Sequence, residues 1–131
     1  MKKTVLKPEG VHAPFSSYSH GIVVEGAGRI VFCAGQVAGD ADGNIVGVGD
    51  FEAQGAQVIA NMRAVLAEAG ATFADVVKLT TYVVGQDNAQ KGRDLVGRHF
   101  SAPPPANTLC VLAGLAHPDF LVEIEATAVL P

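Results

Sequence analysis

The sequence predicts an α+β fold: a mixed sheet with two helices packed on one of its faces. Two observations lead to this prediction. The expected elements follow one another as strand, strand, helix, strand, helix, strand and strand, and such a segregated mixture is typical of a sheet covered on one side. The chain has 131 residues, of which 49% are hydrophobic, enough to bury one core. We therefore expect one domain over residues 1–131.

The first two strands are expected at residues 22–25 and 29–35, which are rich in apolar and β-branched side chains. Gly26, Ala27 and Gly28 lie between them and suit a tight turn, so the pair is typical of a hairpin. Residues 37–50 contain several glycines with Asp and Asn. We expect an irregular loop there, because these residues tolerate turn conformations.

The first helix is expected at residues 51–69, where apolar residues recur at spacings of three, four and seven. Asp50 can cap its amino end, and Gly70 can end it in a left-handed conformation. The next segment, residues 76–84, is rich in Val, Thr and Tyr, which favour a strand, and Gly85 is expected to end it.

The second helix is expected at residues 87–100, although Gly92 and Gly97 lower its helical propensity. Its apolar face is expected to turn inward and to consist of Leu95, Val96 and Phe100. Two further strands are expected at residues 108–112 and 120–129.

The formal net charge is -4, and no run of Lys or Arg follows the first seven residues, so the basic surface that nucleic acid requires is not expected. The chain starts without the apolar stretch of a signal peptide, and no apolar run reaches the ~20 residues that span a bilayer. We therefore expect a cytoplasmic protein with no nucleic-acid and no membrane partner. In that compartment Cys33 and Cys110 stay reduced, and both are expected to be small buried residues.

The sequence carries no motif for a metal or a cofactor. Its histidines lack metal-ligand spacing, and the patterns HExxH and CxxC do not occur. Residues 47–49 lack the third glycine and the preceding strand of a dinucleotide site. The GxSxG elbow of serine hydrolases is also missing from the sequence. We predict neither a metal nor a cofactor.

Several short segments, in order along nearly the whole chain, match one known pattern. They are Tyr18-Ser19, Ala34-Gly35-Gln36, residues 61–66, residues 76–80, and residues 122–129 with the sequence Val-Glu-Ile-Glu-Ala-Thr-Ala-Val. This ordered set resembles the RidA (YjgF) family of small trimeric proteins.

The resemblance implies a chorismate-mutase-like fold, a homotrimer, and ligand sites in the clefts between subunits. It also implies a small-molecule imine or enamine as the ligand, with hydrolytic deamination by water attack. Active members of the family grip the substrate carboxylate with an Arg just after Pro-Ala. Here Asn107 follows Pro105-Ala106, so we expect a substrate different from the usual 2-imino acids.

Other positions also correspond to site positions of the family. Glu123 is expected to hold a water and take part in proton transfer, and Glu125 shares its side of the strand. Ala34 replaces the family's serine before Gly-Gln. Leu109 stands at a frequent cysteine position, with Cys110 one step away on the opposite face of the strand.

Three more residues complete the predicted site. Tyr18 would present a ring and a hydroxyl to a planar ligand, and Gly35 would let a ligand approach the backbone. Arg93 falls near a family asparagine that faces the cleft, where it would supply the positive charge that Asn107 lacks. Each also has a structural alternative: a solvated carboxylate for Glu123, a packing ring for Tyr18, a strand end for Gly35 and a solvated helix residue for Arg93.

These expectations leave three functions open. The first is an enzyme that deaminates an imine or enamine, and the second is a non-catalytic metabolite-binding or regulatory trimer that keeps the cleft without turnover. The third is an RNA-cleaving protein, a function attached to some family members, which the acidic balance and the missing basic stripe disfavour.

Overall fold

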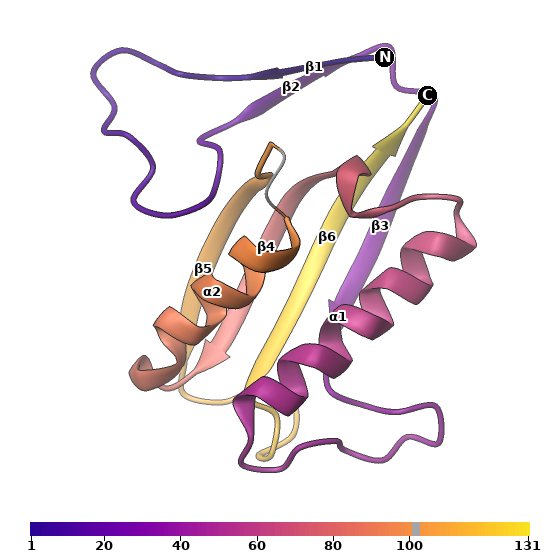
Figure 1. Cartoon of the computed structure of the whole chain (residues 1–131), viewed down its shortest axis with the longest axis vertical. Coiled ribbons are helices and arrows are strands. Elements are labelled where there is room, and N and C mark those ends of the chain that lie inside the picture. The colour runs from indigo at the N-terminus through magenta and orange to yellow at the C-terminus, as the bar shows by residue number, and fades with distance from the viewer. Residues whose placement is uncertain (101–102) are drawn as a thin grey trace.

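The computed structural model describes residues 1–100 and 103–131 of the chain. Its main sheet consists of β3 (Arg29–Gln36), β4 (Val76–Val84), β5 (Ala106–Leu112) and β6 (Val122–Leu130). They lie in the order β3-β6-β4-β5, with β4 and β5 parallel and the other pairs antiparallel. Helices α1 (Phe51–Glu68) and α2 (Ala89–His99) cover one face of this sheet (Figure 1). The predicted α+β fold with a mixed sheet and two helices on one face is confirmed.

The predicted hairpin of residues 22–25 and 29–35 is wrong. The strand β2 (Ile22–Glu25) pairs instead with β1 (Lys2–Val5), a strand that the sequence analysis missed, in a separate two-stranded sheet. The polar start of the chain gave no strand signal. The backbone N–H of Gly28 donates to the carbonyl of Leu130 at 2.9 Å, so the turn directs β3 onto β6 rather than back onto β2.

The ends of α1 follow the predicted signals. The carboxylate of Asp50 accepts a hydrogen bond from the backbone N–H of Ala53 at 3.1 Å. At the other end Gly70 has φ +74°, and the N–H of Ala71 donates to the carbonyl of Leu66 at 2.9 Å. A left-handed glycine at this position allows the chain to turn while it satisfies carbonyls of the last helical turn.

The glycines of the helix layer are explained by close packing. A Cβ built at Gly92 would lie 2.8 Å from Cγ1 of Val83, and one at Gly55 would lie 3.0 Å from Cδ2 of Leu95. Gly92 therefore lets α2 approach β4, and Gly55 lets the two helices approach each other. Glycine lowers the helical propensity at position 92, and the close packing of α2 against β4 offsets this loss of stability.

Several element boundaries differ from the prediction. The helix α2 begins at Ala89, because a short 3-10 turn, η2 (Gln86–Asn88), precedes it. The strand β5 begins two residues earlier than expected, at Ala106, which pairs with Lys78 of β4. The strand β6 begins two residues later than expected, at Val122.

Alternation along β6 decides which face each side chain meets. Val122, Ile124 and Ala126 are buried against the helices, whereas Glu123 and Glu125 are half-buried on the face that the helices leave open. The buried side of the sheet forms one apolar core with both helices. Leu95 and Val96 of α2, with Phe100 directly after it, belong to this core, so the predicted inward face of the second helix is confirmed. The core side chains of α1 are Phe51, Val58, Ile59, Met62 and Leu66.

The two cysteines are both free thiols. Cys33 is 3% exposed and belongs to the core, as expected. Cys110 is only half-buried, because it alternates with Leu109 and so faces away from the helices.

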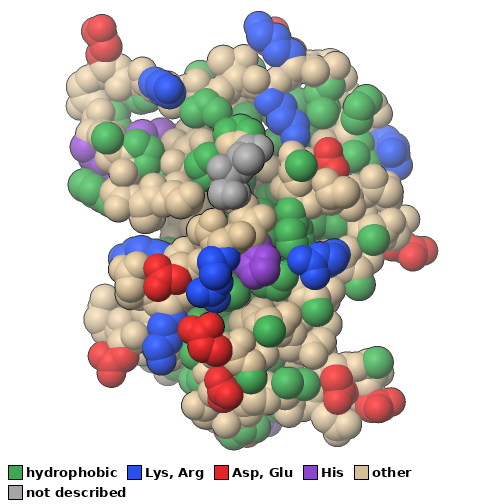
Figure 2. Space-filling view, in the orientation of Figure 1, with side chains coloured by type: hydrophobic (Ala, Val, Ile, Leu, Met, Phe, Trp, Pro, Cys, Tyr) green, Lys and Arg blue, Asp and Glu red, His purple; other side chains and the backbone are tan. Residues whose placement is uncertain are grey.

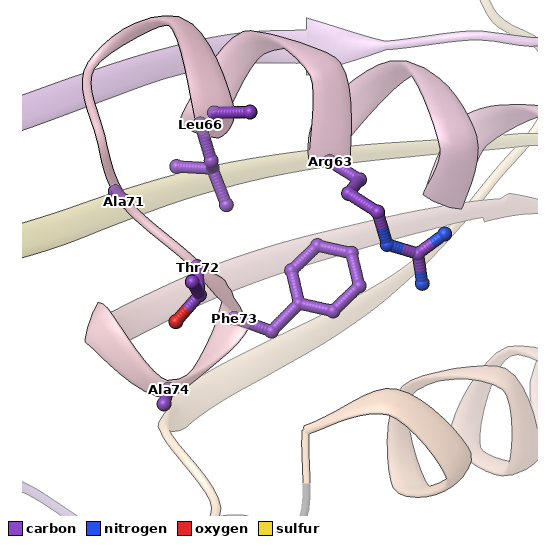
Figure 3. A pocket seen from close by; sticks show the side chains of 7 residues that line it. Arg63, Leu66, Ala71, Thr72, Phe73 and Ala74 are labelled. Atoms are coloured by element: carbon purple, nitrogen blue, oxygen red, sulfur yellow. The ribbon is translucent and has the colours of Figure 1, made fainter.

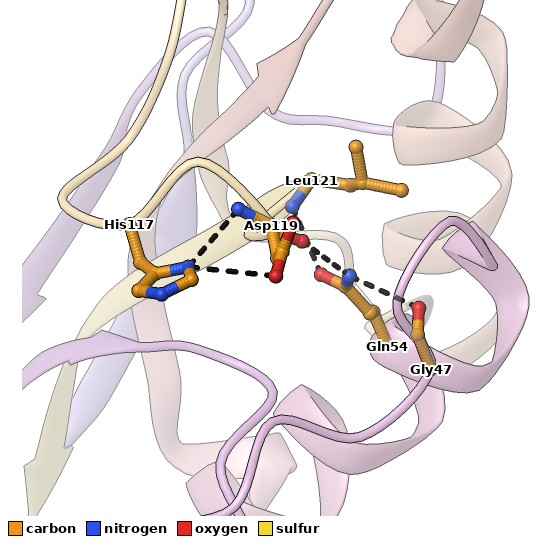
Figure 4. Close-up of polar contacts among 5 residues, drawn as sticks. All are labelled: Gly47, Gln54, His117, Asp119 and Leu121. Atoms are coloured by element: carbon orange, nitrogen blue, oxygen red, sulfur yellow. Dashed lines mark hydrogen bonds and ion pairs between the residues drawn. The ribbon is translucent and has the colours of Figure 1, made fainter.

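The fully buried Gln54 joins three segments of the chain (Figure 4). Its side-chain nitrogen donates to the carbonyls of Gly47 at 3.1 Å and Asp119 at 2.7 Å. Its side-chain oxygen accepts from the backbone N–H of Leu121 at 2.9 Å. One side chain on α1 therefore fastens the loop before the helix and the loop before β6.

The side seen in Figure 2 carries mixed charges. Basic and acidic side chains are interspersed there, and no continuous basic stripe crosses this view of the described residues. In residues 1–100 and 103–131, no helix is long and apolar enough to cross a membrane.

Candidate functional site

The predicted site residues lie on opposite faces of the main sheet. The hydroxyl of Thr81 donates to Oδ1 of Asn107 at 3.1 Å, and Thr81 is fully buried on the helix side. Asn107 and Leu109 therefore face the helix layer. Glu123 faces the opposite side, where no helix covers the sheet. Each group lines its own hollow.

The first hollow, which we call the helix-side hollow, has a volume of about 210 Å³. It is lined by Phe15, Ser16, Tyr18, Arg93, Asn107 and Leu109. Four residues predicted from distant parts of the sequence thus come together here: Tyr18, Arg93, Asn107 and Leu109. The grouping arises because α2 crosses over β5 and the segment before β2 lies against the start of β5.

Hydrogen bonds fix the segment that carries Tyr18. The N–H of Ser19 donates to the carbonyl of Pro105 at 3.0 Å, and the hydroxyl of Ser19 donates to the carbonyl of Pro104. The hydroxyl of Tyr18 accepts from the N–H of Phe15 at 3.2 Å. Tyr18 is therefore held beside the prolines that lead into β5, close to Asn107.

The polar groups of the helix-side hollow are rich in hydrogen-bond donors. The guanidinium of Arg93 contacts Oε1 of Gln90 at 3.5 Å, and within the described residues no acidic group forms an ion pair with it. Because Thr81 occupies Oδ1 of Asn107, the amide nitrogen of Asn107 is left to donate. Such an arrangement suits a ligand with a carboxylate or a carbonyl oxygen.

The second hollow, which we call the open-face hollow, has a volume of about 280 Å³. It is lined by Gly35, Tyr82, Leu112, Leu115, Glu123 and Glu125. Here Glu123 lies against Gly35, since a Cβ built at Gly35 would be 2.9 Å from Cδ of Glu123. This hollow therefore joins two predicted residues, and its polar lining is acidic.

Glu125 is engaged by a neighbour, unlike Glu123. The hydroxyl of Tyr82 donates to the carboxylate of Glu125, and this hydrogen bond, with burial and the negative charge, raises the pKa of Tyr82. No hydrogen bond to the Glu123 carboxylate is found among the described residues. Glu123 is thus the carboxylate of this hollow that remains available to a water or a ligand.

Lys78 lies near the same face. Burial lowers the pKa of Lys78, and the charges of Glu125 and Cys110 oppose that shift. Its ammonium donates to the carbonyl of Leu79 at 2.6 Å and to the hydroxyl of Thr108 at 3.3 Å. These bonds hold Lys78 against the sheet.

Ala34 lines neither of these hollows and its side chain is exposed. Sequence reasoning missed Phe15 and Tyr82. Tyr82 stands opposite Glu123 in the register of β4 and β6, so strand alternation would have found it had the pairing been known. Phe15 lies in an irregular segment, where no period marks a residue as important.

Two further hollows contain little of the predicted site. One, of about 360 Å³, lies between the end of α1 and the 3-10 turn η1 (Phe73–Asp75), where the guanidinium of Arg63 lies 5.0 Å from the ring centre of Phe73 (Figure 3). The other, of about 340 Å³, lies beside the first hollow and shares Tyr18 with it. In the part of the chain that is described, no three His, Cys, Asp or Glu side chains gather as metal ligands would.

The sheet, its helix layer and the small, partly polar hollows on both faces define an α+β protein with candidate sites for small molecules. Comparison with known proteins shows which family the chain resembles. The family model described as Endoribonuclease L-PSP matches residues 10–130. A RutC family protein of Pyrococcus abyssi is 34% identical over 128 residues, which are 98% of each chain.

Solved structures agree with these matches. YyfB of Yersinia pestis, described as a protein of the conserved Rid family, is 43% identical, with a TM-score of 0.84 over 99% of this chain and 100% of its own. RidA of a Psychrobacter species is 25% identical, with a TM-score of 0.71 over 97% of this chain and 99% of its own. The chain belongs to the Rid (YjgF) family, as the resemblance indicated.

Proposed function

We propose that this protein binds an imine or enamine metabolite in a cleft between two subunits of a homotrimer and deaminates it by hydrolysis, and that this substrate differs from the usual 2-imino acids. The observation that supports this most is the separation of the two hollows. One offers hydrogen-bond donors and a guanidinium, and the other offers a free carboxylate. Together they contain the groups that imine hydrolysis needs.

A second subunit is required because the sheet lies between the two hollows. Asn107 and Glu123 of one chain cannot both contact a small ligand across it. If the open face of one copy packs near the β5 edge of the next, the two hollows combine into one site. Exposed apolar side chains on that face favour such packing, since Phe32 is 79% exposed and Ile30 is 57% exposed.

The positive charge that Asn107 lacks is supplied by Arg93 in this proposal. In the family pattern that the sequence resembles, an Arg stands at position 107 and an Asn near position 93. This chain has the two residue types in reverse, and both line one hollow. A carboxylate can therefore still be bound, but from the helix side rather than from β5.

In the reaction, Glu123 holds a water and accepts its proton as the oxygen attacks the imine carbon. Glu123 passes this proton to the nitrogen, which gives a carbinolamine. The carboxylate then takes the hydroxyl proton of the carbinolamine and passes it to the nitrogen as the C–N bond breaks, so that ammonia leaves. The oxygen stays on carbon as a carbonyl group. Arg93 and Asn107 orient the substrate and do not take part in proton transfer.

A mixing experiment tests whether the site is shared between subunits. Glu123→Gln removes the carboxylate, and Asn107→Asp removes the donor but keeps the oxygen that accepts from Thr81. Each variant alone is expected to lose turnover of imines generated in place. Chains of both kinds, produced together in equal amounts, assort at random, so about a quarter of the interfaces regain both groups. No recovery in the mixed oligomer would contradict a shared site.

An exchange experiment tests the role of Arg93. Arg93→Asn is expected to weaken the binding of a carboxylate by about tenfold or more, because a charged hydrogen bond is lost. The double variant Arg93→Asn with Asn107→Arg should bind the carboxylate with its original affinity again. If Arg93→Asn leaves carboxylate affinity unchanged, Arg93 is only a solvated helix residue.

The same assays address the alternatives. Binding of a carboxylate without turnover of any imine would favour the non-catalytic metabolite-binding or regulatory protein. An RNA substrate is disfavoured by the net charge of -4 and by the interspersed charges in Figure 2. Salt-sensitive RNA binding would reverse that judgement.

A further inference from the structure

Phe15 is an unusual residue in the helix-side hollow. Its side chain is 83% exposed, although burial of an aromatic ring usually stabilises a protein. It does not lie loose on the surface, because the ring of His12 stacks on it with the centres 3.9 Å apart and the planes 9° apart. One face of the Phe15 ring is thus covered and the rest is left open.

The ring is held in place by its neighbours. The rings of His12 and His20 meet edge to face at 5.1 Å, and those of Tyr18 and His20 at 5.6 Å. A ring nitrogen of His20 lies 2.6 Å from the carbonyl oxygen of His12. We call His12, Phe15, Tyr18 and His20 the aromatic arm. Its contacts fix Phe15 in the absence of a ligand, so little ordering is needed on binding.

The same hollow has a charged end. Phe15 and Tyr18 of the aromatic arm line it together with the guanidinium of Arg93 and the amide of Asn107. A ligand that fills its volume of about 210 Å³ therefore meets aromatic rings and hydrogen-bond donors at once. Rings prefer to pack on other rings, and a guanidinium prefers a carboxylate.

We propose that this hollow selects ligands in which an aromatic ring is joined to a carboxylate, and that Phe15 is the specificity-determining residue. The preferred substrates are then imines or enamines of aryl-bearing acids. The statement about substrates rests on the proposed function, whereas the statement about ligand binding does not. Phe15 supplies the ring against which the ligand packs, and Arg93 supplies the charge that sets its direction.

Two stable probes test the binding. Phenylacetate and cyclohexylacetate have the same carboxylate and similar size, but only phenylacetate has an aromatic ring. The wild-type protein is expected to bind phenylacetate about fivefold more tightly, the factor that corresponds to about 1 kcal/mol of aromatic pairing. Phe15→Ala and Phe15→Leu should both abolish this preference, since leucine restores apolar area without a ring.

The control is Val48→Ala. Val48 is 62% exposed, lies in the loop before α1 and lines neither hollow, so its variant should keep the preference. An equal affinity for both probes in the wild type, or a preference that survives Phe15→Ala, would overturn the inference. So would a change of oligomeric state in Phe15→Ala with no change in preference, because the ring would then serve a contact between copies.

Turnover separates this inference from the proposed function. Imines generated from 3-amino-3-phenylpropanoate and 3-amino-3-cyclohexylpropanoate are not 2-imino acids and provide a matched pair of substrates. The ratio of their kcat/KM values should fall about fivefold in Phe15→Ala. If neither imine is hydrolysed but the Phe15-dependent preference for phenylacetate is present, the proposed function fails and the binding inference stands. If both imines are hydrolysed with the same ratio in wild type and variant, the inference fails and the proposed function stands.

Discussion

The side chain of Glu123 lies directly against the backbone of Gly35, its neighbour across the β3–β6 pair. A Cβ built at Gly35 would overlap the Glu123 carboxylate and would lie 3.0 Å from its Cγ. The pairing of β3 with β6 shifts register between Cys33 and Gln36, which places Gly35 beside Glu123. Because Gly35 has no side chain, the space beside it stays free for the candidate catalytic carboxylate of Glu123.

The first prediction concerns Gly35→Ala. The added methyl forces the flexible end of Glu123 away, so turnover is expected to fall by about tenfold or more while stability changes by less than about 1 kcal/mol. Imine hydrolysis and urea unfolding measure the two effects. Gly39→Ala is the control, because a Cβ at Gly39 meets nothing within 4 Å. A large loss of stability in Gly35→Ala with turnover unchanged would separate Gly35 from the chemistry.

The second prediction concerns the orientation of Asn107. Thr81→Val removes the hydroxyl that donates to Oδ1 of Asn107 at 3.1 Å but keeps the shape of the side chain. The amide can then turn, so carboxylate binding is expected to weaken severalfold, and stability to fall by about 1 kcal/mol. Thr80→Val on the opposite face is the control. Calorimetric titration with phenylacetate measures the affinity of both variants. Equal affinities would mean that Asn107 does not contact the ligand.

The third prediction concerns Gln54. Gln54→Leu leaves the carbonyls of Gly47 and Asp119 and the N–H of Leu121 without their present partner. Stability is expected to fall by about 3 kcal/mol or more, because buried polar groups lose their hydrogen bonds. Urea unfolding measures the loss.

The control for Gln54 is Gln57→Leu. Gln57 is half-buried, and its side chain forms one hydrogen bond among the described residues, to Asn61 at 2.8 Å. Its variant should therefore cost less than about 1 kcal/mol. Equal losses for Gln54→Leu and Gln57→Leu would mean that the loops do not depend on Gln54.

The fourth prediction compares two glycines of the same helix. Gly92→Ala should destabilise the protein by about 1–3 kcal/mol, since its Cβ would lie 2.8 Å from Val83 and 3.2 Å from Leu109. Gly97→Ala should stabilise it by about 0.5–1 kcal/mol, because among the described residues its Cβ meets Ser17 alone, at 3.8 Å, and alanine favours the helix. Thermal unfolding measures both. The same sign for both substitutions would contradict the packing described for α2.

The fifth prediction concerns the pH dependence of stability. Burial, with the charges of Arg63 and Arg98, lowers the pKa of His99 below its ordinary value of 6.5. The unfolded chain therefore binds a proton more readily, so stability is complete above pH 6.5 and falls as the pH decreases from there through the lower folded pKa. The carboxylate of Glu52 pairs with Arg98 at 3.3 Å, and no carboxylate is among the groups that shift the pKa of His99.

Urea unfolding at several pH values below 6.5 measures this effect. His99→Gln should flatten the decline. Arg63→Met should reduce it, because the pKa of His99 then moves back toward 6.5. A decline as steep in His99→Gln as in the wild type would assign it to other groups.

Much of the fold could be predicted because its signals are local. Asp50 and Gly70 mark the ends of α1, and alternation in β6 separates Glu123 from its buried neighbours. The partner of β2 could not be predicted, since it depends on a bond between Gly28 and Leu130, far apart in the sequence. Turn residues alone do not decide whether two strands pair with each other.

The site was predicted only in part for a similar reason. The resemblance to the family predicted Arg93 and Asn107 as site residues, and the structure places both in one hollow. The resemblance did not indicate that Asn107 and Glu123 of one chain would face opposite sides of the sheet. Phe15 was missed because an aromatic ring in an irregular segment belongs to no periodic pattern.

The position of β6 has a consequence for how the chain acquires its structure during synthesis. This strand follows all the others in sequence, yet it lies between β3 and β4. Arg29 of β3 therefore cannot pair with Leu130 of β6 until nearly the whole sequence has been synthesised. Until β6 has left the ribosome, β4 and β5 can pair with each other, but β3 has no strand of the main sheet to pair with. The core between the sheet and α1 therefore stays incomplete. Nascent chains that stop before β6 should therefore be targets for chaperones, and the complete four-stranded sheet should form only after β6 has been translated.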